Sequence, residues 1–363
     1  MRAIVLRNER LGLESLPDPT PEAGEVLVKT LACGICGSDL HMADHCHDAL
    51  AGLRKGRVPV AFEPDQGVVF GHEFCAEILD HGPGCDKRYK AGTRVCSVPY
   101  AVNAQGFHHI GYANAYPGGF GELMRLQEHS LLEVPGDLPS ELAALTEPLA
   151  IGRHAVARAR LAGGEVPIVI GCGPVGLSVV MALKAAGFGP VVATDFSPHR
   201  RQLAECLGAD IVVDPAERAP FDCWLEAAEA PQGFDMYGPM AMLSIGAQPR
   251  PCVAFECVGV PGLIARTMLD LPPRSRLVVV GVCMQTDQIE PIVGIGKELD
   301  LSFSFGYRPE EFAATLTDLA DGRLDAAPLI TDRVTLDGVP AAFETLRHPG
   351  DHAKILIQHG DRT

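Results

Sequence analysis

The chain has 363 residues and a formal net charge of −16 at pH 7, with 47% hydrophobic and 21% charged residues. This length exceeds one ordinary hydrophobic core and predicts two domains, and the composition is that of a globular protein. The acidic balance argues against nucleic acid or an anionic membrane as a partner. The chain has no internal repeat and no signal-peptide pattern, so we expect a soluble, cytoplasmic protein.

Two features are open to misinterpretation. Residues 166–183 carry no charge over 18 positions, about the minimum length of a membrane span. Glycines and a proline interrupt this run where a buried strand would turn into a helix, so we expect no span. The 12 cysteines are irregularly spaced, which favours free or metal-bound thiols in a reducing compartment over a disulfide framework.

The first part of the chain is predicted to be rich in short β-strands. Turns that contain Pro and Gly separate runs of apolar or alternating residues. The predicted strands are Ala3–Leu6, Glu25–Cys33, Phe74–Asp80, Thr93–Val98 and Leu131–Val134. Ser140 is expected to cap a short helix through residues 141–145.

From about Ile151 the pattern changes to alternating strands and helices, which predicts a parallel sheet covered by helices on both faces. After about Gly306 mixed elements return, and we expect them to complete the sheet of the first domain. The simplest partition is residues 1–151, 152–305 and 306–363. The predicted elements are the strand Val166–Ile170, the helix Val175–Ala186, the strand Pro190–Thr194, the helix Arg200–Leu207, the strands Ile211–Val213, Cys252–Cys257 and Arg276–Val282, the helix Pro309–Leu319 and the strand Lys354–Gln358.

A glycine-rich turn lies between the first strand and helix of the central domain. Gly171, Gly173 and Gly176, with Pro174 and Val175 before the last of them, have the G-x-G-x-x-G spacing of a dinucleotide-binding turn. The first glycine permits the tight turn, the second lets a pyrophosphate approach the backbone, and the third lets the helix pack on the strand. The helix N-terminus adds unpaired N–H groups and a positive dipole end.

Asp195 ends the next predicted strand, nineteen residues after Gly176. A carboxylate there accepts hydrogen bonds from the adenosine ribose and repels a 2′-phosphate, so NAD is favoured over NADP. Arg200 and Arg201 follow, and they are either phosphate-binding groups or solvated helix residues. A glycine-rich turn beside a helix-capping aspartate, with no cofactor, is the alternative interpretation.

Three separated segments carry residue types that bind zinc. Cys36, His72 and Glu147 offer a thiolate, an imidazole and a carboxylate, whose charges sum to about −2. Three such ligands leave a fourth position for water or substrate, as catalytic zinc sites require. Cys33 forms a Cys-x-x-Cys pair with Cys36, so a redox pair or half of a structural zinc site remains an alternative.

These segments resemble those of the zinc-containing medium-chain alcohol dehydrogenases. Residues 33–41, Gly71-His72-Glu73 and residues 146–150 match the three metal segments of that family in order, and the glycine-rich turn follows. The resemblance spans nearly the whole chain. It implies an α/β protein with a GroES-like β-rich catalytic domain and a Rossmann doubly wound parallel-sheet domain. The segment around Glu147 looks more like the sorbitol, threonine and glucose dehydrogenase branches.

The resemblance also implies roles for individual residues. Cys36, His72 and Glu147 would hold one catalytic zinc, with Glu73 beside the metal as a neighbour or an occasional ligand. Ser38 would take the proton of the alcohol, and His41 would pass it on towards solvent. Arg200, Asp195 and the glycine-rich turn would bind NAD. Zinc lowers the pKa of a bound alcohol and so favours hydride transfer to the nicotinamide.

We therefore expect a zinc-dependent oxidoreductase that transfers hydride between a secondary alcohol, polyol- or sugar-like, and NAD. The alternative is a dehydrogenase of simple alcohols, aldehydes or threonine-like amino-alcohols. A non-catalytic NAD(H)-binding module is disfavoured, because a pure binder does not need the proton relay of Ser38 and His41. The expected partners are a small-molecule alcohol or carbonyl substrate and copies of the same chain, in a homo-oligomer (dimer or tetramer).

Three segments depart from the family. Many members bind a structural zinc through four closely spaced cysteines, whereas no cysteine follows Cys96 before Glu122, so we expect no structural zinc. Residues 40–70 are longer than usual and contain His45-Cys46-His47. They form either a lid over the substrate or a surface insertion with solvated histidines. Residues 216–250, with Trp224, are expected near the adenine of the cofactor or at a subunit interface.

Overall fold

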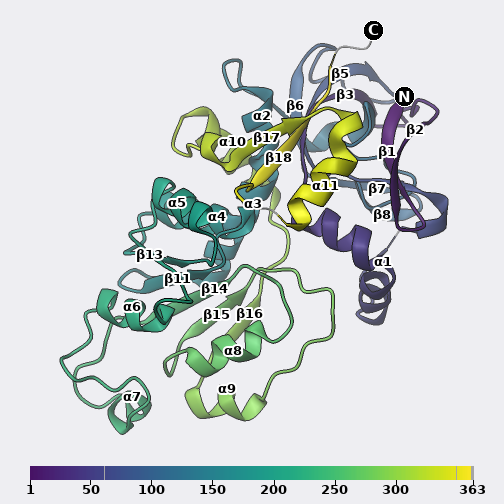
Figure 1. Cartoon of the computed structure of the whole chain (residues 1–363). Coiled ribbons are helices and arrows are strands. Elements are labelled where there is room, and N and C mark those ends of the chain that lie inside the picture. Colours follow the sequence, from purple (N-terminus) through teal and green to yellow (C-terminus); the bar gives the residue numbers. More distant parts are fainter. Residues whose placement is uncertain (61, 349, 361–363) are drawn as a thin grey trace. The chain divides into compact units, whose positions relative to one another are not determined.

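The computed structural model describes residues 1–60, 62–348 and 350–360, and these form two compact units (Figure 1). Unit 1 contains Met1–Glu147 and the carboxy-terminal segment from Phe312 onwards, and unit 2 contains Pro148–Glu311. The chain leaves unit 1 at the start of helix α3 (Thr146–Ala159) and returns within α10 (Pro309–Ala320). Among the described residues, no helix combines the length and the apolar character that a membrane crossing needs.

Unit 1 is built mainly from antiparallel strands. Its largest sheet has seven strands in the order β10-β6-β5-β3-β18-β17, with β9 also paired to β3. A second sheet has the order β2-β1-β4, and β7 and β8 form a hairpin. The strands are β1 Arg2–Arg7, β2 Arg10–Ser15, β3 Glu25–Gly34, β4 Val68–Val69, β5 Glu73–His81, β6 Arg94–Ser97, β7 Tyr100–Asn103, β8 Gly106–His109, β9 Leu123–Gln127, β10 Leu131–Glu133, β17 Ile330–Val334 and β18 Lys354–Gln358. The carboxy-terminal strand β18 pairs antiparallel with β3, so the two ends of the chain share one sheet.

The helices of unit 1 include one that the sequence pattern did not predict. Helix α1 covers Gly37–Lys55, so most of it lies in segment 40–70, which we expected to be a lid or a surface insertion. Cys36 occupies its N-cap position, and the Asp39 carboxylate accepts the Cys36 backbone N–H at 2.9 Å. The backbone leaves helical geometry at His45, where the helix kinks. The other helices that lie entirely in unit 1 are α2 Ser140–Ala144 and α11 Val339–Arg347, and α10 belongs to it from Phe312 onwards. There are 3₁₀ turns at Pro64–Gln66, Glu128–Ser130, Ala327–Leu329 and Leu336–Gly338.

Two helix starts differ in how their N-terminal groups are satisfied. Ser140 is the first residue of α2, Pro139 takes the N-cap position, and no side chain caps the helix. The prediction that Ser140 caps this helix was therefore wrong, because its hydroxyl instead accepts from Arg94 Nη1 at 3.2 Å. Ser197, in contrast, caps α5 (Pro198–Cys206) by accepting the Arg200 backbone N–H.

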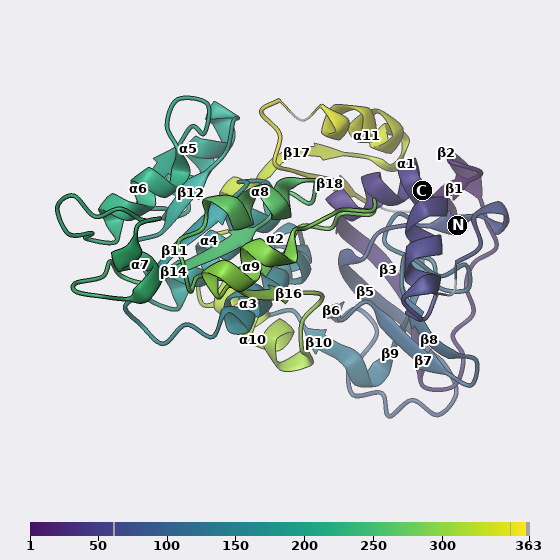
Figure 2. The same ribbon diagram turned by 90° about the horizontal axis from the view of Figure 1, so that it is seen from below.

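Unit 2 contains a six-stranded parallel sheet in the order β13-β12-β11-β14-β15-β16. In chain order this is 3-2-1-4-5-6, the doubly wound arrangement of dinucleotide-binding folds, so the predicted fold class is confirmed. Helices α4 and α5 contact each other, and α8 lies next to α9 (Figure 2). The elements are β11 Val166–Ile170, α4 Pro174–Ala185, β12 Val192–Thr194, α5 Pro198–Cys206, β13 Ile211–Val213, α6 Pro220–Ala227, α7 Pro239–Leu243, β14 Cys252–Glu256, α8 Leu263–Asp270, β15 Arg276–Val279, α9 Pro291–Lys297 and β16 Asp300–Phe303.

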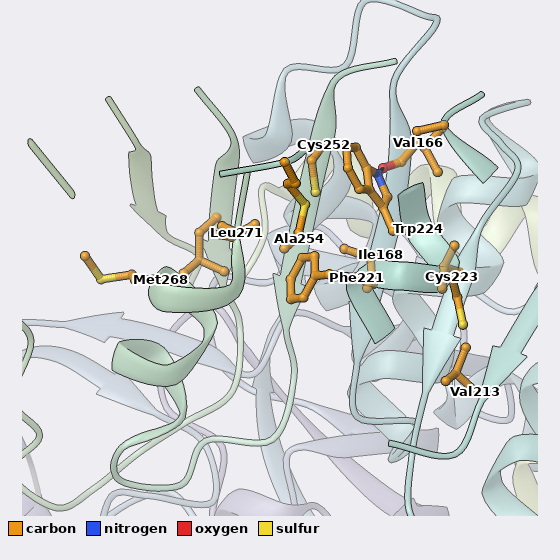
Figure 3. Packing of buried hydrophobic residues seen from close by; sticks show 14 of the residues in the cluster. Val166, Ile168, Val213, Phe221, Cys223, Trp224, Cys252, Ala254, Met268 and Leu271 are labelled. Atoms are coloured by element: carbon orange, nitrogen blue, oxygen red, sulfur yellow. Dashed lines mark hydrogen bonds between the residues drawn. The ribbon is translucent and has the colours of Figure 1, made fainter. Parts of the chain in front are cut away.

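The core of unit 2 explains part of the unusually long segment 216–250. Trp224 and Phe221 of α6 pack with Ile168 of β11 and Met268 of α8 (Figure 3). The Trp224 indole is 1% exposed, and its N–H donates to the backbone oxygen of Val166 at 3.1 Å. A buried indole with its N–H satisfied is a structural anchor. Trp224 therefore belongs to the core of its own unit, and the expectation of an adenine-side or interface position does not apply to it.

Candidate active site

The centre of the candidate site is a group of three side chains in unit 1. Ligand atoms of Cys36, His72 and Glu73 all lie within 4.8 Å of one another. Cys36 precedes α1, His72 immediately precedes β5, and Glu73 is the first residue of β5. His72 is 6% exposed and Glu73 is fully buried, whereas Cys36 remains partly accessible. Sulfur, nitrogen and oxygen donors at this spacing are the set that zinc accepts.

Glu147, the third ligand proposed from the sequence, lies at the start of α3 and is 7% exposed. Among the described residues it is not a member of the group within 4.8 Å, in which the carboxylate belongs to Glu73. Its charge still acts beside the group, because the Glu147 carboxylate contributes, after Glu73 and Cys36, to raising the pKa of Lys354, the lysine that contacts Glu73. The role of Glu147 as a ligand stays a prediction.

A buried lysine that the sequence analysis missed holds Glu73. Lys354 Nζ donates to both Glu73 carboxylate oxygens, at 2.7 and 2.8 Å, and to the backbone oxygen of Ile35 at 3.1 Å. Lys354 is 1% exposed. Burial works to lower the pKa of Lys354, but the charges of Glu73, Cys36 and Glu147 outweigh it and raise that pKa. The sequence offered only one signal, a lysine at the start of an otherwise apolar strand, since lysine is almost never fully buried without a partner.

His72 faces a second buried carboxylate. Its Nδ1 lies 3.5 Å from Oδ1 of Asp39, which is fully buried, and among the described residues this nitrogen has no hydrogen-bond partner. The separation is too long for a good hydrogen bond, so we regard the contact as electrostatic. Burial lowers the pKa of His72, but the charges of Asp39 and Cys36 have the larger combined effect and raise it. A carboxylate beside an imidazole suits a metal-binding histidine.

A chain of hydrogen bonds connects the predicted proton acceptor to the same aspartate. Ser38 Oγ lies 2.9 Å from the Tyr112 hydroxyl, which donates to Asp39 Oδ1 at 2.7 Å. His41, the other predicted relay residue, makes no side-chain hydrogen bond to any described residue. Burial, with a smaller effect of His45, lowers its pKa. The sequence around Tyr112 carries no motif that signals its contact with Ser38.

The glycine-rich turn of unit 2 has the predicted steric demands. Gly171 has φ +93°, and a Cβ there would approach Val258 Cγ2 to 2.5 Å. A Cβ on Gly176 would collide with the Gly171 carbonyl oxygen, because the start of α4 packs against the turn. A Cβ on Gly173 would meet nothing within 4 Å, so this position is open. Pro174 and Val175 begin α4.

The polar residues after β12 differ in whether their hydrogen-bonding groups already have a partner in the protein. Asp195 accepts the Cys172 and Ser197 backbone N–H groups, one on each oxygen and both at 2.8 Å. Arg201 binds the backbone oxygen of Asp195 at 2.9 Å and pairs with Asp214 at 2.8 Å. Arg200 Nε is buried and has no partner within the described part of the chain. Of the two arginines, Arg200 therefore has the spare donor.

His47 of segment 40–70 lies in a different environment from the centre. His47 Nε2 is 3.8 Å from Glu9 Oε1, and the buried Cys46 belongs to the same group. The His47 and Glu9 side chains are 74% and 53% exposed. This exposure agrees with the surface-insertion interpretation of His47.

Comparisons with known proteins assign the chain to a family. Residues 22–136 match the family described as alcohol dehydrogenase GroES-like domain, and residues 174–321 match zinc-binding dehydrogenase. The chain is 32% identical to (R,R)-butanediol dehydrogenase of Bacillus subtilis (strain 168), over 99% of both chains. It is 30% identical to L-threonine 3-dehydrogenase of Rhizobium rhizogenes (strain K84 / ATCC BAA-868), over 98% of both.

A solved structure gives the same result. The crystal structure of 2R,3R-butanediol dehydrogenase from Bacillus subtilis is similar at a TM-score of 0.78 and 30% identity, and the match covers 99% of each chain. Two family matches along one chain, a relative above 30% identity over nearly full length and a shared fold agree with the metal group and the glycine-rich turn described above. The chain belongs to the zinc-binding, medium-chain alcohol dehydrogenase family and is an oxidoreductase that uses a nicotinamide cofactor.

Proposed function

We propose that this enzyme transfers hydride between a secondary alcohol, polyol- or diol-like, and NAD, with one catalytic zinc and no structural zinc. The observation that carries the proposal is the group of Cys36, His72 and Glu73, whose ligand atoms lie within 4.8 Å of one another. The likeness to a butanediol dehydrogenase over nearly the whole chain supports a secondary alcohol as the substrate.

The residues present fit a zinc ion in chemistry and in charge. Thiolate, imidazole and carboxylate donors are available, and their ligand atoms lie within 4.8 Å of one another. Ionised Cys36, Glu73 and Glu147 together with protonated Lys354 sum to −2, which balances a divalent cation. We propose Cys36, His72 and Glu147 as the ligands. Glu73 is then the neighbouring carboxylate, restrained by Lys354.

When bound, zinc would polarise the alcohol oxygen and lower the pKa of its proton. The protein's own contribution is to accept that proton and to hold the donors in place. Ser38 is the proposed acceptor and His41, one helical turn later on α1, the proposed next carrier. The lowered pKa of His41 keeps its imidazole neutral at physiological pH, as a proton acceptor must be.

For the cofactor we propose NAD in preference to NADP. The Asp195 carboxylate follows β12 at the position that contacts the ribose in this fold, and its negative charge opposes a 2′-phosphate. Gly173 leaves open space beside the start of α4, where a pyrophosphate can approach the backbone. The spare Arg200 Nε supports a contact between this side chain and the cofactor.

Two further points of the sequence analysis stand as proposals. We propose a homo-oligomer, supported by large apolar side chains exposed in unit 2 on α9 and β16, where Ile292, Ile295 and Phe303 are 68%, 71% and 63% exposed. We also propose that residues 1–151 and 306–363 act as the catalytic domain and 152–305 as the cofactor domain. A threonine-like amino-alcohol is the second candidate substrate, because L-threonine 3-dehydrogenase is a relative at 30% identity.

The test combines metal analysis with turnover. We expect about one zinc per chain and faster turnover of diols and sugar polyols than of simple alcohols or threonine, with NAD preferred over NADP. Cys36→Ser should lose zinc and turnover but keep NADH binding, whereas Cys206→Ser, at an exposed cysteine of unit 2, should lose none of these. Full turnover by Cys36→Ser would overturn the proposal, and two tightly held zincs would overturn its metal count.

A further inference from the structure

We propose that Tyr112 is a positioning residue that fixes the Ser38 hydroxyl as a proton acceptor. The inference rests on the proposed function, because it concerns the serine that would take the proton of the alcohol. It follows from three side chains of unit 1 joined in one line, Ser38, Tyr112 and Asp39.

The direction of each hydrogen bond in this line is determined by how many protons are available. An aspartate carboxylate only accepts, so the Tyr112 hydroxyl must donate to Asp39 Oδ1 at 2.7 Å. A phenol has a single proton, so it has none left for Ser38. The 2.9 Å contact between the two hydroxyls must then be donated by Ser38.

As a consequence, the direction in which the Ser38 O–H donates is fixed. With its proton directed at Tyr112, the Ser38 oxygen has only lone pairs to offer to other groups. A serine in this state accepts the hydrogen bond of an alcohol O–H without first turning its own hydroxyl, and it is aligned to take that proton as it releases its own. Without the Tyr112 hydroxyl, the Ser38 O–H is free to rotate, and part of its orientations present a donor where an acceptor is needed.

Asp39 links this line to the proposed metal ligands. Its second oxygen accepts the Cys36 backbone N–H at 2.9 Å, and its first lies 3.5 Å from His72 Nδ1. The same fully buried carboxylate therefore fixes the backbone of one proposed ligand, faces the ring of another and anchors Tyr112. The proton acceptor and the metal ligands are oriented by one group.

The ring of Tyr112 is held independently of its hydroxyl. Its centroid lies 5.3 Å from that of Phe70, 5.2 Å from His72 and 5.1 Å from His109. Tyr112→Phe therefore removes the hydroxyl and retains these ring contacts, so the substitution isolates the hydrogen bonds.

Unit 1 provides a matched control. The Tyr116 hydroxyl donates to Glu25 Oε1 at 2.7 Å and accepts from Asn103 Nδ2 at 3.1 Å. This arrangement repeats the chemistry at Tyr112, a buried phenol between a carboxylate and a donor, but it does not involve Ser38. Tyr116→Phe thus reproduces the loss of hydrogen bonds without the loss of positioning.

The experiment is a double-mutant cycle in the zinc-loaded enzyme. We expect Tyr112→Phe to lower kcat about three- to tenfold, the effect of one or two hydrogen bonds, with little change in KM, zinc content or NADH affinity. In a Ser38→Ala background the same substitution should cause no further loss, because the hydroxyl that it positions is gone. Tyr116→Phe should leave kcat unchanged. In urea unfolding, Ser38→Ala and Tyr112→Phe should be non-additive, a readout that does not depend on turnover.

Two outcomes would overturn the proposal in distinguishable ways. If Tyr112→Phe lowers kcat by the same factor with and without Ser38→Ala, or leaves kcat unchanged in the enzyme that retains Ser38, Tyr112 does not act through Ser38, although the proposed function stands. If Ser38→Ala alone retains normal turnover, Ser38 is not the proton acceptor, and both this inference and that part of the proposed function are wrong.

Discussion

The candidate metal site of unit 1 and the candidate cofactor site of unit 2 are built from different parts of the chain. In unit 1 the site consists of buried charged and polar side chains brought together from distant segments, such as Glu73 and Lys354. In unit 2 it consists largely of backbone, a turn in which glycines permit close approach and Asp195 accepts backbone N–H groups. The first site depends on every buried charge having a partner, whereas the second depends on open space next to the glycine backbone.

This difference determines how each site should fail. Removing one partner of a buried ion pair leaves the other charge without compensation, which costs far more free energy than the pair itself contributes. Adding a single methyl group to a tight turn forces the backbone apart, although no polar interaction is removed. If both kinds of substitution destabilised the two sites equally, the distinction between a side-chain site and a backbone site would be wrong.

The largest effect is expected for Lys354→Met. It leaves the fully buried Glu73 carboxylate unpaired, and we expect the free energy of unfolding to fall by about 3–5 kcal/mol. The matched control is Lys184→Met in unit 2, because Lys184 also contacts both oxygens of one carboxylate, Asp210, at 3.0 and 2.9 Å. That pair is about one-third exposed, so its loss should cost about 1 kcal/mol or less.

Urea unfolding of both variants measures this contrast. A second variant, Lys354→Met with Glu73→Gln, should recover part of the loss, because the unpaired charge is then gone as well. Similar losses for Lys354→Met and Lys184→Met would contradict the view that burial makes the unit 1 site sensitive to its pairing.

The backbone site is tested by a pair of glycine substitutions. Gly176→Ala should lower the free energy of unfolding by about 1–3 kcal/mol and NADH affinity at least tenfold, because the new Cβ collides with the Gly171 carbonyl oxygen. Gly173→Ala should leave stability nearly unchanged, since its Cβ meets no protein atom within 4 Å, but it should still weaken NADH binding. Calorimetric titration and urea unfolding separate the two effects, and unaltered NADH affinity in Gly173→Ala would argue against a pyrophosphate at this position.

The same difference explains what could be predicted from the sequence. The glycine-rich turn is contiguous, so Gly171, Gly173 and Gly176 predict a strand, a turn and a helix in that order. The strands Val166–Ile170 and Ile211–Val213 were predicted with their observed bounds. Lys354 and Glu73 are 281 residues apart, and neither residue type alone signals the other. Their pairing depends on β18 entering the sheet beside β3, which is a property of the fold.

Tyr112 and helix α1 were missed for a related physical reason. The hydroxyl of Tyr112 meets Ser38 from 74 residues away, in a segment with irregular structure and no recognisable period. Helix α1 carries polar and charged residues on much of its surface, and its kink at His45 interrupts the apolar spacing. Periodicity detects a helix only where one face is continuously buried.

The smallest predicted effect concerns His359 of unit 1, a side chain that is neutral in the folded protein. Its environment should make the stability depend on pH. Burial lowers the pKa of His359 to about 4, and one ring nitrogen lies 2.9 Å from the Gly119 backbone oxygen. The unfolded chain, with an ordinary histidine pKa of about 6.5, binds more protons between these two values, so stability is full above pH 6.5 and falls as the pH drops towards 4.

His359→Gln keeps a donor and cannot titrate. We expect it to reduce the loss of unfolding free energy between pH 7 and 5 by about 1–2 kcal/mol, as measured by urea unfolding. The exposed His47→Gln provides the comparison, and an equal change in both variants would mean that burial of His359 is not the cause.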